Sequence, residues 1–281
     1  MNIADAKSTG ANRLAESGVP EPVREASLIL AFALGKDAAF LYAHPEYELN
    51  VDETIRYGNA IERRSAREPL QYIVGIQEFY RHDFLVTPAV LIPRPETEMI
   101  VSKSIEFLSG RSSPRFLDVG TGSGCIAISI LKHVPGASAV AVDISAEALK
   151  VAAKNADTHG VNEELELKVS DVYSQVGNEQ FDLIVSNPPY IPAEDIEGLQ
   201  PEVRDHEPLG ALTDGGVGTA VIDRVIKGAF ERLTSGGLLL VEIGIGQDQT
   251  VLKAAKTEEW ASTGIERDFQ GIPRTLVFKR S

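Results

Sequence analysis

Near its middle the chain reads Phe116-Leu117-Asp118-Val119-Gly120-Thr121-Gly122-Ser123-Gly124, and a mainly apolar segment follows at 125–133. The first four residues have the pattern of a buried strand, and the glycines allow a tight turn into a helix. Strand, glycine loop and helix in this order form the ligand-binding turn of doubly wound α/β proteins. The segment therefore predicts a parallel sheet that binds a nucleotide-like ligand at the end of its first strand.

Strands and helices alternate downstream of this turn, which indicates a mainly parallel sheet with helices on both faces. We expect strands at 115–119, 139–143, 165–169, 181–186, 237–243, 263–269 and 274–279, and helices at 125–133, 145–159, 217–233 and 247–258. The last two strands are too close in sequence for a helical crossover, so we expect them to pair antiparallel.

The chain upstream of the turn predicts a different architecture. Residues 1–70 show apolar positions at helical spacing and form a small helical domain, with Arg56, Arg63, Arg64 and Arg67 on a solvated face. The short β-rich segments that follow, beginning with Tyr72–Gly75, suggest a hairpin. We therefore expect a helical domain at 1–70, a β-hairpin or linker at 71–92 and the α/β domain at 93–281.

Composition excludes several classes of protein. The 281 residues carry a net charge of −14, which argues against broad binding to nucleic acid phosphates. No apolar run is long enough for a membrane span, and the N-terminus has no signal or transit sequence. The single Cys125 fits a reducing cytoplasm, and no spacing suggests a metal site. We expect the five histidines to serve surface or packing roles.

Three strand ends predict a cofactor site. Asp143 ends the second strand, where a carboxylate can hold ribose hydroxyls, and Asp171 follows the third strand, where an adenine would lie. A nicotinamide dinucleotide would also use such a site, but the glycine spacing and the carboxylate of Asp118 favour the cationic S-adenosyl-L-methionine. The candidate cofactor residues are Asp118, Gly120, Thr121, Gly122, Ser123, Gly124, Asp143, Ile144, Asp171, Val172 and Asn187.

The fourth strand of the α/β domain leads into Asn187-Pro188-Pro189-Tyr190. Two prolines make a stiff turn with outward carbonyls, and the asparagine adds an acceptor, so the segment suits an NH₂ group of a substrate. A simple strand-terminating turn is the alternative reading.

These motifs resemble those of a known family. A glycine loop followed by Asn187–Tyr190 is similar to methyltransferases that act on amide or exocyclic amino nitrogens. The segments Pro69–Gly75, Phe79-Tyr80, Ile92-Pro93-Arg94-Pro95-Glu96-Thr97-Glu98 and Glu202–Pro208 narrow the resemblance to the peptide chain release factor N5-glutamine methyltransferases, the PrmC or HemK family. The resemblance covers nearly the whole chain.

The resemblance implies a Rossmann-like class I S-adenosylmethionine methyltransferase domain with a seven-stranded sheet. It also implies that a helical bundle precedes this domain in the chain and docks the release factor. It implies methylation of the glutamine of a Gly-Gly-Gln motif in class 1 release factors, with S-adenosyl-L-homocysteine as the product. From the composition and the N-terminus we expect a cytoplasmic protein that binds neither nucleic acid directly nor membrane, and we expect it to be a monomer. Val217-Gly218-Thr219 and Val172 depart from common features of the family, which puts cofactor affinity in question more than activity.

By the same resemblance, Asn187, Pro188, Pro189 and Tyr190 are the catalytic residues. The side-chain oxygen of Asn187 and the carbonyl of Pro188 would accept the two N–H bonds of the substrate amide, and Tyr190 would shape the pocket. Arg94 and Glu96 either shape the mouth of the substrate site or form a structural ion pair.

Three other functions share some of these features. A methyltransferase acting on a ribosomal-protein glutamine would share the glycine loop and Asn187–Tyr190, but the N-terminal segments favour a release factor substrate. An N6-adenine methyltransferase would need a basic groove, which the net charge of −14 disfavours. A non-catalytic S-adenosylmethionine-binding protein would tolerate loss of Asn187, which is present.

Overall fold

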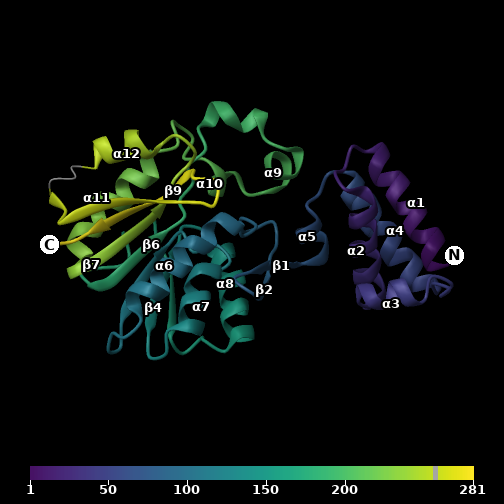
Figure 1. The fold of residues 1–281 in the computed structure, drawn as a ribbon, viewed down its shortest axis with the longest axis horizontal. Helices are drawn as coiled ribbons and strands as arrows, with labels where there is room; N and C mark the ends of the chain where they lie inside the picture. Colours follow the sequence, from purple (N-terminus) through teal and green to yellow (C-terminus); the bar gives the residue numbers. More distant parts are fainter. Residues whose placement is uncertain (256–258) are drawn as a thin grey trace. The chain divides into compact units, whose positions relative to one another are not determined.

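The computed structural model describes residues 1–255 and 259–281, and these fall into two compact units (Figure 1). The helical unit comprises Met1–Ile76 together with Gln200–His206, and the sheet unit comprises Gln77–Leu199 and Glu207–Ser281. The predicted domain boundaries at residues 70 and 92 stay predictions. The return of 200–206 to the helical unit has no counterpart in the sequence pattern. The end of the helix predicted at 247–258 lies outside the described residues.

Caps and close packing define the helical unit. Its helices are α1 (Ile3–Glu16), α2 (Pro22–Leu34), α3 (Ala38–Ala43), α4 (Val51–Ser65), α5 (Leu70–Val74) and α9 (Pro201–His206). Asn50 caps α4 in a capping box with Glu53, and Gly35 ends α2 in the left-handed conformation. The Tyr57 hydroxyl donates to the carbonyl of Ala6 at 2.9 Å, beside Gly10, where a side chain would collide with the phenol ring. Glycine in α1 therefore permits the close approach of α4.

Arg64 corrects the expectation of a solvated arginine face. Its side chain is only 4% exposed and pairs with Glu25 and Glu202, while Arg67 binds the other oxygen of Glu202 at 2.7 Å. Burying a guanidinium requires partners of opposite charge. Glu202 lies 138 residues from Arg64, so no local pattern could have indicated the pairing.

The segment at 70–74 is a second correction, because it is the short helix α5 and not a strand. Gly75 ends this helix with a φ of 83°, a left-handed conformation that does not occur within a regular β-strand. Ile73 lies in the core of the helical unit. Tertiary packing therefore overrides the strand preference of the apolar residues here. The predicted hairpin starts only afterwards, with β1 (Ile76–Phe79) and β2 (His82–Leu85).

The large sheet of the sheet unit has seven strands in the described residues, in the order β5-β4-β3-β6-β7-β9-β8, and the β1–β2 hairpin is a separate two-stranded sheet. They are β3 (Arg115–Val119), β4 (Ser138–Asp143), β5 (Leu165–Val169), β6 (Phe181–Ser186), β7 (Leu233–Glu242), β8 (Ser262–Arg267) and β9 (Pro273–Lys279). All neighbours pair parallel except that β9 runs antiparallel to β7 and to β8. The predicted fold class, including its antiparallel last pair, is confirmed.

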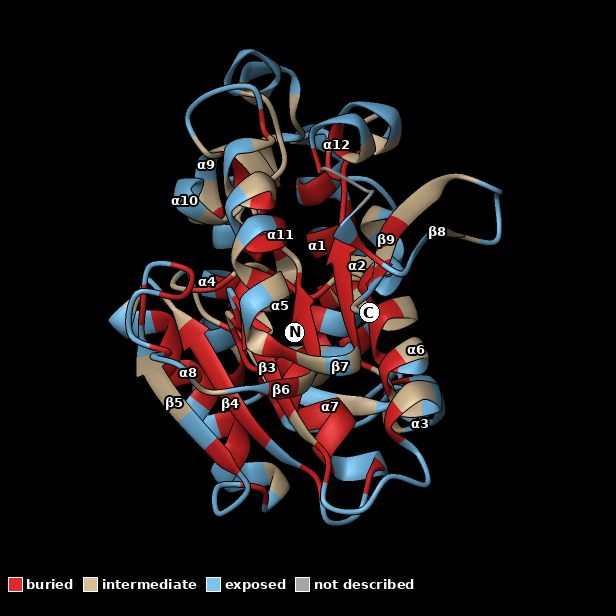
Figure 2. Ribbon diagram, turned by 90° about the vertical axis from the view of Figure 1, so that its left-hand side faces the viewer, coloured by how far each residue is buried: buried red, intermediate tan, exposed pale blue. Residues whose placement is uncertain are grey.

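Successive residues of the central strands face opposite layers of helices, as a period of two requires. Phe116 joins the core that holds helices α6 (Glu98–Leu108) and α7 (Cys125–His133), and Leu117 joins the core that holds α11 (Ala220–Arg232) and α12 (Asp248–Ala254). Strands β3 and β6 are accordingly buried along most of their length (Figure 2).

Four further elements complete the part of the sheet unit that the structure describes. They are the 3₁₀ helices η1 (Pro95–Thr97) and η2 (Ala193–Gly198), and the helices α8 (Ala146–His159) and α10 (Leu209–Leu212). Ser145 caps α8 and Gly160 ends it, as predicted. No helix within the described residues is long and apolar enough to cross a membrane.

Three histidines pack together, which the sequence did not suggest. The His82 ring lies 5.7 Å from that of His133 and 5.6 Å from that of His159, between the β1–β2 hairpin and the ends of α7 and α8. Within residues 1–255 and 259–281, no group of side chains has an arrangement that could hold a metal ion. Because the His82 ring contacts the other two, protonation of those rings opposes its own protonation, and the charge state of the cluster matters for stability.

Candidate active site

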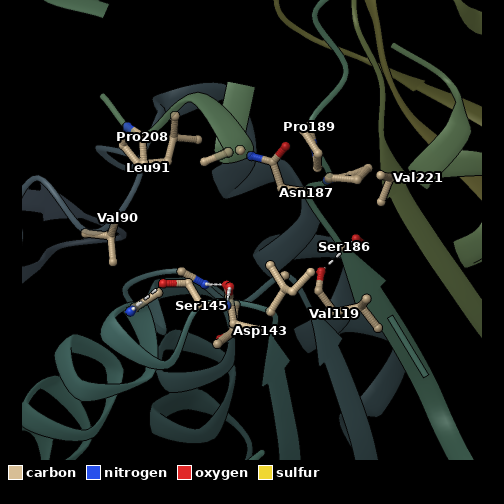
Figure 3. Close-up of a pocket in the computed structure, with 18 of the residues that line it drawn as sticks. Val90, Leu91, Val119, Asp143, Ser145, Ser186, Asn187, Pro189, Pro208 and Val221 are labelled. Atoms are coloured by element: carbon tan, nitrogen blue, oxygen red, sulfur yellow. Dashed lines mark hydrogen bonds between the residues drawn. The ribbon is translucent and has the colours of Figure 1, made fainter. Parts of the chain in front are cut away.

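A cavity of about 590 Å³ opens at the carboxyl ends of β3, β4, β5 and β6 (Figure 3). It lies where the strand order reverses, between β3 and β6, which is where doubly wound sheets bind ligands. Asp143 and Ser145 lie on one wall, and Asn187 and Pro189 lie on the facing wall (Figure 3). Of the predicted site residues, those on its wall are Gly120, Thr121, Gly122, Ser123, Asp143, Ile144, Asp171, Val172, Asn187, Pro188, Pro189 and Arg94.

The glycine loop between β3 and α7 depends on backbone conformations that favour glycine. Gly120, Gly122 and Gly124 have φ values of 77°, 55° and 81°. The N–H groups of Gly120 and Thr121 both donate to the carbonyl of Val142, at 2.8 and 3.0 Å. A Cβ on Gly124 would come within 3.2 Å of Ala152 in α8, so this glycine serves helix packing, whereas Gly120 and Gly122 lie on the cavity wall.

Asp143 connects the loop to the end of β4. Its Oδ2 accepts the N–H of Gly122 at 2.9 Å, and its Oδ1 accepts the N–H of Ser145 at 2.8 Å. Burial raises the pKa of this carboxyl, and the backbone donors, Ser145 first, act in the opposite direction. The carboxylate thus holds the glycine loop in place and lies on the cavity wall, where it can also accept hydroxyl groups of a ligand.

Asp118 lies beneath the loop, fully buried, and is absent from the described wall of the cavity. Thr121 Oγ1 donates to its Oδ2 at 2.7 Å, and its Oδ1 has no partner among the described residues. Burial raises the pKa of this carboxyl to about 7, against the opposing effect of the Thr121 hydrogen bond. A cationic ligand above the loop would favour the ionised form.

The end of β5 completes the predicted cofactor half of the cavity. Asp171 forms an ion pair with Arg224 at 2.7 Å, and both residues lie on the wall. Val172 has a φ of 51°, a conformation that is strained for a β-branched residue. The Ser170 hydroxyl donates to the Val172 carbonyl at 2.9 Å and so supports this backbone. Carboxylates at two adjacent strand ends, an apolar patch and a buried carboxylate suit a ligand with a ribose, a base and a positive charge.

The predicted substrate half is built around Asn187, which directly follows β6. Ser186 Oγ donates to the carbonyl of Val119 at 2.7 Å and connects the ends of β3 and β6. The Nδ2 of Asn187 donates to Thr97 Oγ1 at 3.0 Å. Tyr190 is absent from the described wall and donates its hydroxyl to Glu242 Oε1 at 3.2 Å. The structure therefore brings Asn187 to the cavity and turns Tyr190 toward a buried carboxylate.

Arg94 pairs with Glu207 and not with Glu96. Glu207 is buried, and its Oε2 also accepts the N–H of Ile92 at 3.1 Å. This connection joins the segment 91–94 to the start of α10, and both contribute to the cavity wall. The sequence left two alternatives for Arg94, a role at the mouth of the substrate site or an ion pair with Glu96. The structure contains an ion pair of Arg94, but its partner is Glu207.

Several residues that hold the site in place are not among the candidates that the sequence suggests. Asn155 in α8 donates to the carbonyls of Ser123 and Leu85, at 2.8 and 3.0 Å, and so supports the glycine loop. Thr97 and Glu242, which are not among the candidate site residues of the sequence, accept hydrogen bonds from Asn187 and Tyr190, respectively. The one available signal for Glu242 was an acid at the end of an otherwise apolar strand.

Comparisons with known proteins give the same architecture along the whole chain. The family described as PrmC N-terminal domain matches residues 5–75, and the family described as Methyltransferase small domain matches residues 102–199. The release factor glutamine methyltransferase of Koribacter versatilis is 41% identical and covers 100% of this chain and 99% of its own length. The protein of the same name from Geobacter sulfurreducens is 42% identical, over 94% of this chain and 91% of its own length.

Solved structures support the fold of the sheet unit. A methyltransferase from Pyrococcus furiosus superposes with a TM-score of 0.54 at 18% identity, over 72% of this chain and 91% of that protein. The Thermus thermophilus 16S rRNA N2 G1207 methyltransferase, solved in complex with AdoMet and guanosine, gives a TM-score of 0.53 at 16% identity, over 73% and 50%. At such identities the likeness concerns the fold alone.

Proposed function

The chain belongs to the release factor glutamine methyltransferase family, and from that membership we propose that it methylates the side-chain nitrogen N5 of the glutamine in the Gly-Gly-Gln motif of class 1 peptide chain release factors. The observation that carries the proposal is the full-length match combined with Asn187 on the cavity wall opposite the cofactor half. A release factor substrate would place the activity in the cytoplasm, where translation takes place.

The cofactor is S-adenosyl-L-methionine. When bound, it would supply a methyl group that is attached to a positively charged sulfur. The substrate nitrogen forms a bond to this methyl carbon while the electron pair of the carbon–sulfur bond goes to the sulfur, and the product is S-adenosyl-L-homocysteine. Asp143 would bind the ribose hydroxyls, and the strand end at Asp171 and Val172 would hold the adenine. The backbone of Gly120 and Gly122 allows the ligand to approach the loop closely.

The substrate poses a specific chemical difficulty, because the lone pair of an amide nitrogen is delocalised into its carbonyl. Asn187 Oδ1 and the Pro188 carbonyl would accept the two N–H bonds of the amide, and so hold its nitrogen toward the methyl group. The rigid backbone of Pro188 and Pro189 keeps these acceptors in place without further reorganisation. The methylated nitrogen, now positively charged, then gives up one proton to solvent water. The two oriented acceptors together would lower the barrier by several kcal/mol, or roughly a few powers of ten in rate.

We also assign the helical unit to docking of the release factor. Residues 5–75 match the N-terminal domain of the family, and these helices have a hydrophobic core of their own. The sheet unit alone would then keep the cofactor site and lose affinity for the protein substrate.

The experiment uses tritiated S-adenosyl-L-methionine and two purified forms of a class 1 release factor, one natural and one with the Gly-Gly-Gln glutamine changed to alanine. Label on the natural factor alone supports the proposal. Asn187→Ala should abolish labelling, whereas the control Asn178→Ala, an exposed asparagine away from the cavity wall, should not. Labelling of a ribosomal protein or an adenine in place of the release factor would overturn the proposal.

A further inference from the structure

Four side chains form one continuous hydrogen-bonded chain behind the substrate half of the cavity. Asn187 Nδ2 donates to Thr97 Oγ1 at 3.0 Å, and Thr97 Oγ1 donates to Glu242 Oε2 at 2.7 Å. The other oxygen of Glu242 accepts the hydroxyl of Tyr190 at 3.2 Å. The chain thus links η1, β7 and both ends of the Asn187–Tyr190 segment.

The chemistry of these groups sets the direction of every bond. An ionised carboxylate only accepts hydrogen bonds, so Glu242 must receive the single hydroxyl proton of Thr97. The Thr97 oxygen can then act only as an acceptor toward Asn187, and the Asn187 amide must present its NH₂ side to it. The Oδ1 of Asn187 is thereby directed away from Thr97 and is available to an external donor.

We propose that Thr97 and Glu242 are positioning residues for methyl transfer, because together they select the one orientation of the Asn187 amide that can accept an N–H of the substrate glutamine. With the amide turned over, an NH₂ group would face the NH₂ group of the substrate and the hydrogen bond would be lost. The inference rests on the proposed function, since it assigns these residues to the same site.

The burial of Glu242 supports this assignment. Its side chain is 2% exposed at the end of an apolar strand, where an apolar residue would avoid the cost of burying a carboxylate. Glu96 and Arg274 are the charged groups whose fields reach it, Glu96 opposing ionisation and Arg274 favouring it. Thr97 and Tyr190 donate hydrogen bonds that favour ionisation of Glu242. Burial raises the pKa of the Cys125 thiol in α7, and the negative charge of Glu242 raises it further.

Ionisation of Glu242 is therefore within reach of ordinary pH. Burial raises the pKa of this carboxyl to about 7, although the two hydroxyl groups act to lower it. Once protonated, the carboxyl can donate to Thr97 and no longer enforces the direction of the bond to Asn187. The rate of methyl transfer should consequently decrease on the acid side of an apparent midpoint near neutrality.

The main test compares Thr97→Val, which keeps the shape but removes the hydroxyl, with Thr97→Ser, which keeps the hydroxyl. We expect Thr97→Val to lower kcat about 10- to 100-fold, the cost of an unpaired polar group, and Thr97→Ser to stay within about threefold of the natural enzyme. Ser104→Ala in α6 removes another buried hydroxyl, one that donates to the carbonyl of Ile100, and should leave kcat unchanged.

Two further readouts separate positioning from a structural role. Calorimetric affinity for S-adenosyl-L-methionine should be similar in Thr97→Val and Thr97→Ser, whereas the thermal midpoint of Thr97→Val should be lower, because this variant leaves one buried oxygen of Glu242 without its donor. Glu242→Gln offers one acceptor for two hydroxyls, so kcat should decrease about tenfold and its pH profile should lose the acid limb. Equal kcat in Thr97→Val and Thr97→Ser, or an unchanged acid limb in Glu242→Gln, would overturn the inference.

The natural enzyme serves as the reference for the proposed function itself. If it fails to label the release factor, the proposed function fails before any variant is compared. If it labels the glutamine and Thr97→Val does so equally fast, only the inference about Thr97 and Glu242 fails.

Discussion

Replacing Asp143 with asparagine tests the structure most directly, because this carboxylate has two roles. Its two oxygens accept the N–H groups of Gly122 and Ser145 at 2.9 and 2.8 Å, and it also lies on the wall of the cavity. An asparagine has one oxygen, so its NH₂ group must face one of the two backbone donors. One hydrogen bond is lost, and the other loses its ionic character.

The expected magnitude follows from these contacts. A hydrogen bond to a charged group is worth about 1.5–3 kcal/mol, and a neutral one about 1 kcal/mol. These lost hydrogen bonds weaken the hold of residue 143 on the glycine loop and on the hydroxyl groups of the ligand. S-adenosyl-L-methionine should therefore bind about 10- to 100-fold more weakly, which corresponds to a loss of about 1.4–2.7 kcal/mol in binding free energy. Titration calorimetry with S-adenosyl-L-methionine measures this change without any catalytic step.

Asp182→Asn is the matched control. Asp182 also accepts a backbone N–H, that of Arg115 at 3.0 Å, but at the opposite end of the parallel strands. The control should lower the thermal midpoint and leave the affinity for S-adenosyl-L-methionine unchanged. Affinity within threefold of natural in Asp143→Asn, or an equal loss in Asp182→Asn, would refute the assignment of Asp143 to the cofactor.

Three other changes are expected to act through different parts of the fold. Gly218→Ala should reduce activity at least tenfold and stability by about 1–3 kcal/mol, because its Cβ would lie 2.2 Å from the Tyr190 carbonyl and its φ is 79°; full activity with an unchanged denaturant midpoint would contradict this. Tyr190→Phe should move the acid limb of the pH–rate profile to higher pH, because the hydrogen bond from Tyr190 lowers the pKa of Glu242; an unmoved limb in steady-state rates would contradict it. The pKa of His82 is lowered, first by burial and then by the neighbouring His159 and His133, so folding stability should be lost as the pH decreases through about 6.5, the pKa of an unfolded histidine. Thermal midpoints at pH 7.5 and 5.5 measure that loss, and His82→Phe should reduce it; an equal loss in the variant would show that other groups cause it.

The sequence alone was informative wherever a local pattern has a single structural solution. The glycine loop after Val119 required a strand-to-helix turn, the alternation downstream required a parallel sheet, and the short last connection required an antiparallel end. The segment Asn187–Tyr190 follows a buried strand, and the ends of parallel strands meet at one edge, so the sequence predicted that Asn187 lies at the ligand-binding edge of the sheet, where it does line the cavity.

Local patterns failed where the decisive partner is distant in sequence. The strand preference at 70–74 was overridden because Ile73 packs into the core of the helical unit. The burial of Arg64 depends on Glu202, 138 residues away, and Arg94 selects Glu207 over its near neighbour Glu96. Charge and spacing cannot identify such pairs, because the partners become neighbours only when the chain has folded.

The sequence by itself therefore determined the fold class, the glycine loop after β3 and the position of the Asn187–Tyr190 motif after β6, since all three follow from short-range periodicity and from residues with few allowed conformations. Only the tertiary structure decided how that motif is oriented. Thr97 lies 90 residues before Asn187, and Glu242 lies 145 residues after Thr97, yet their hydrogen bonds select which side of the Asn187 amide is available. Hydrogen-bond direction is a property of groups brought together in space, so it exists only once the sheet unit has formed.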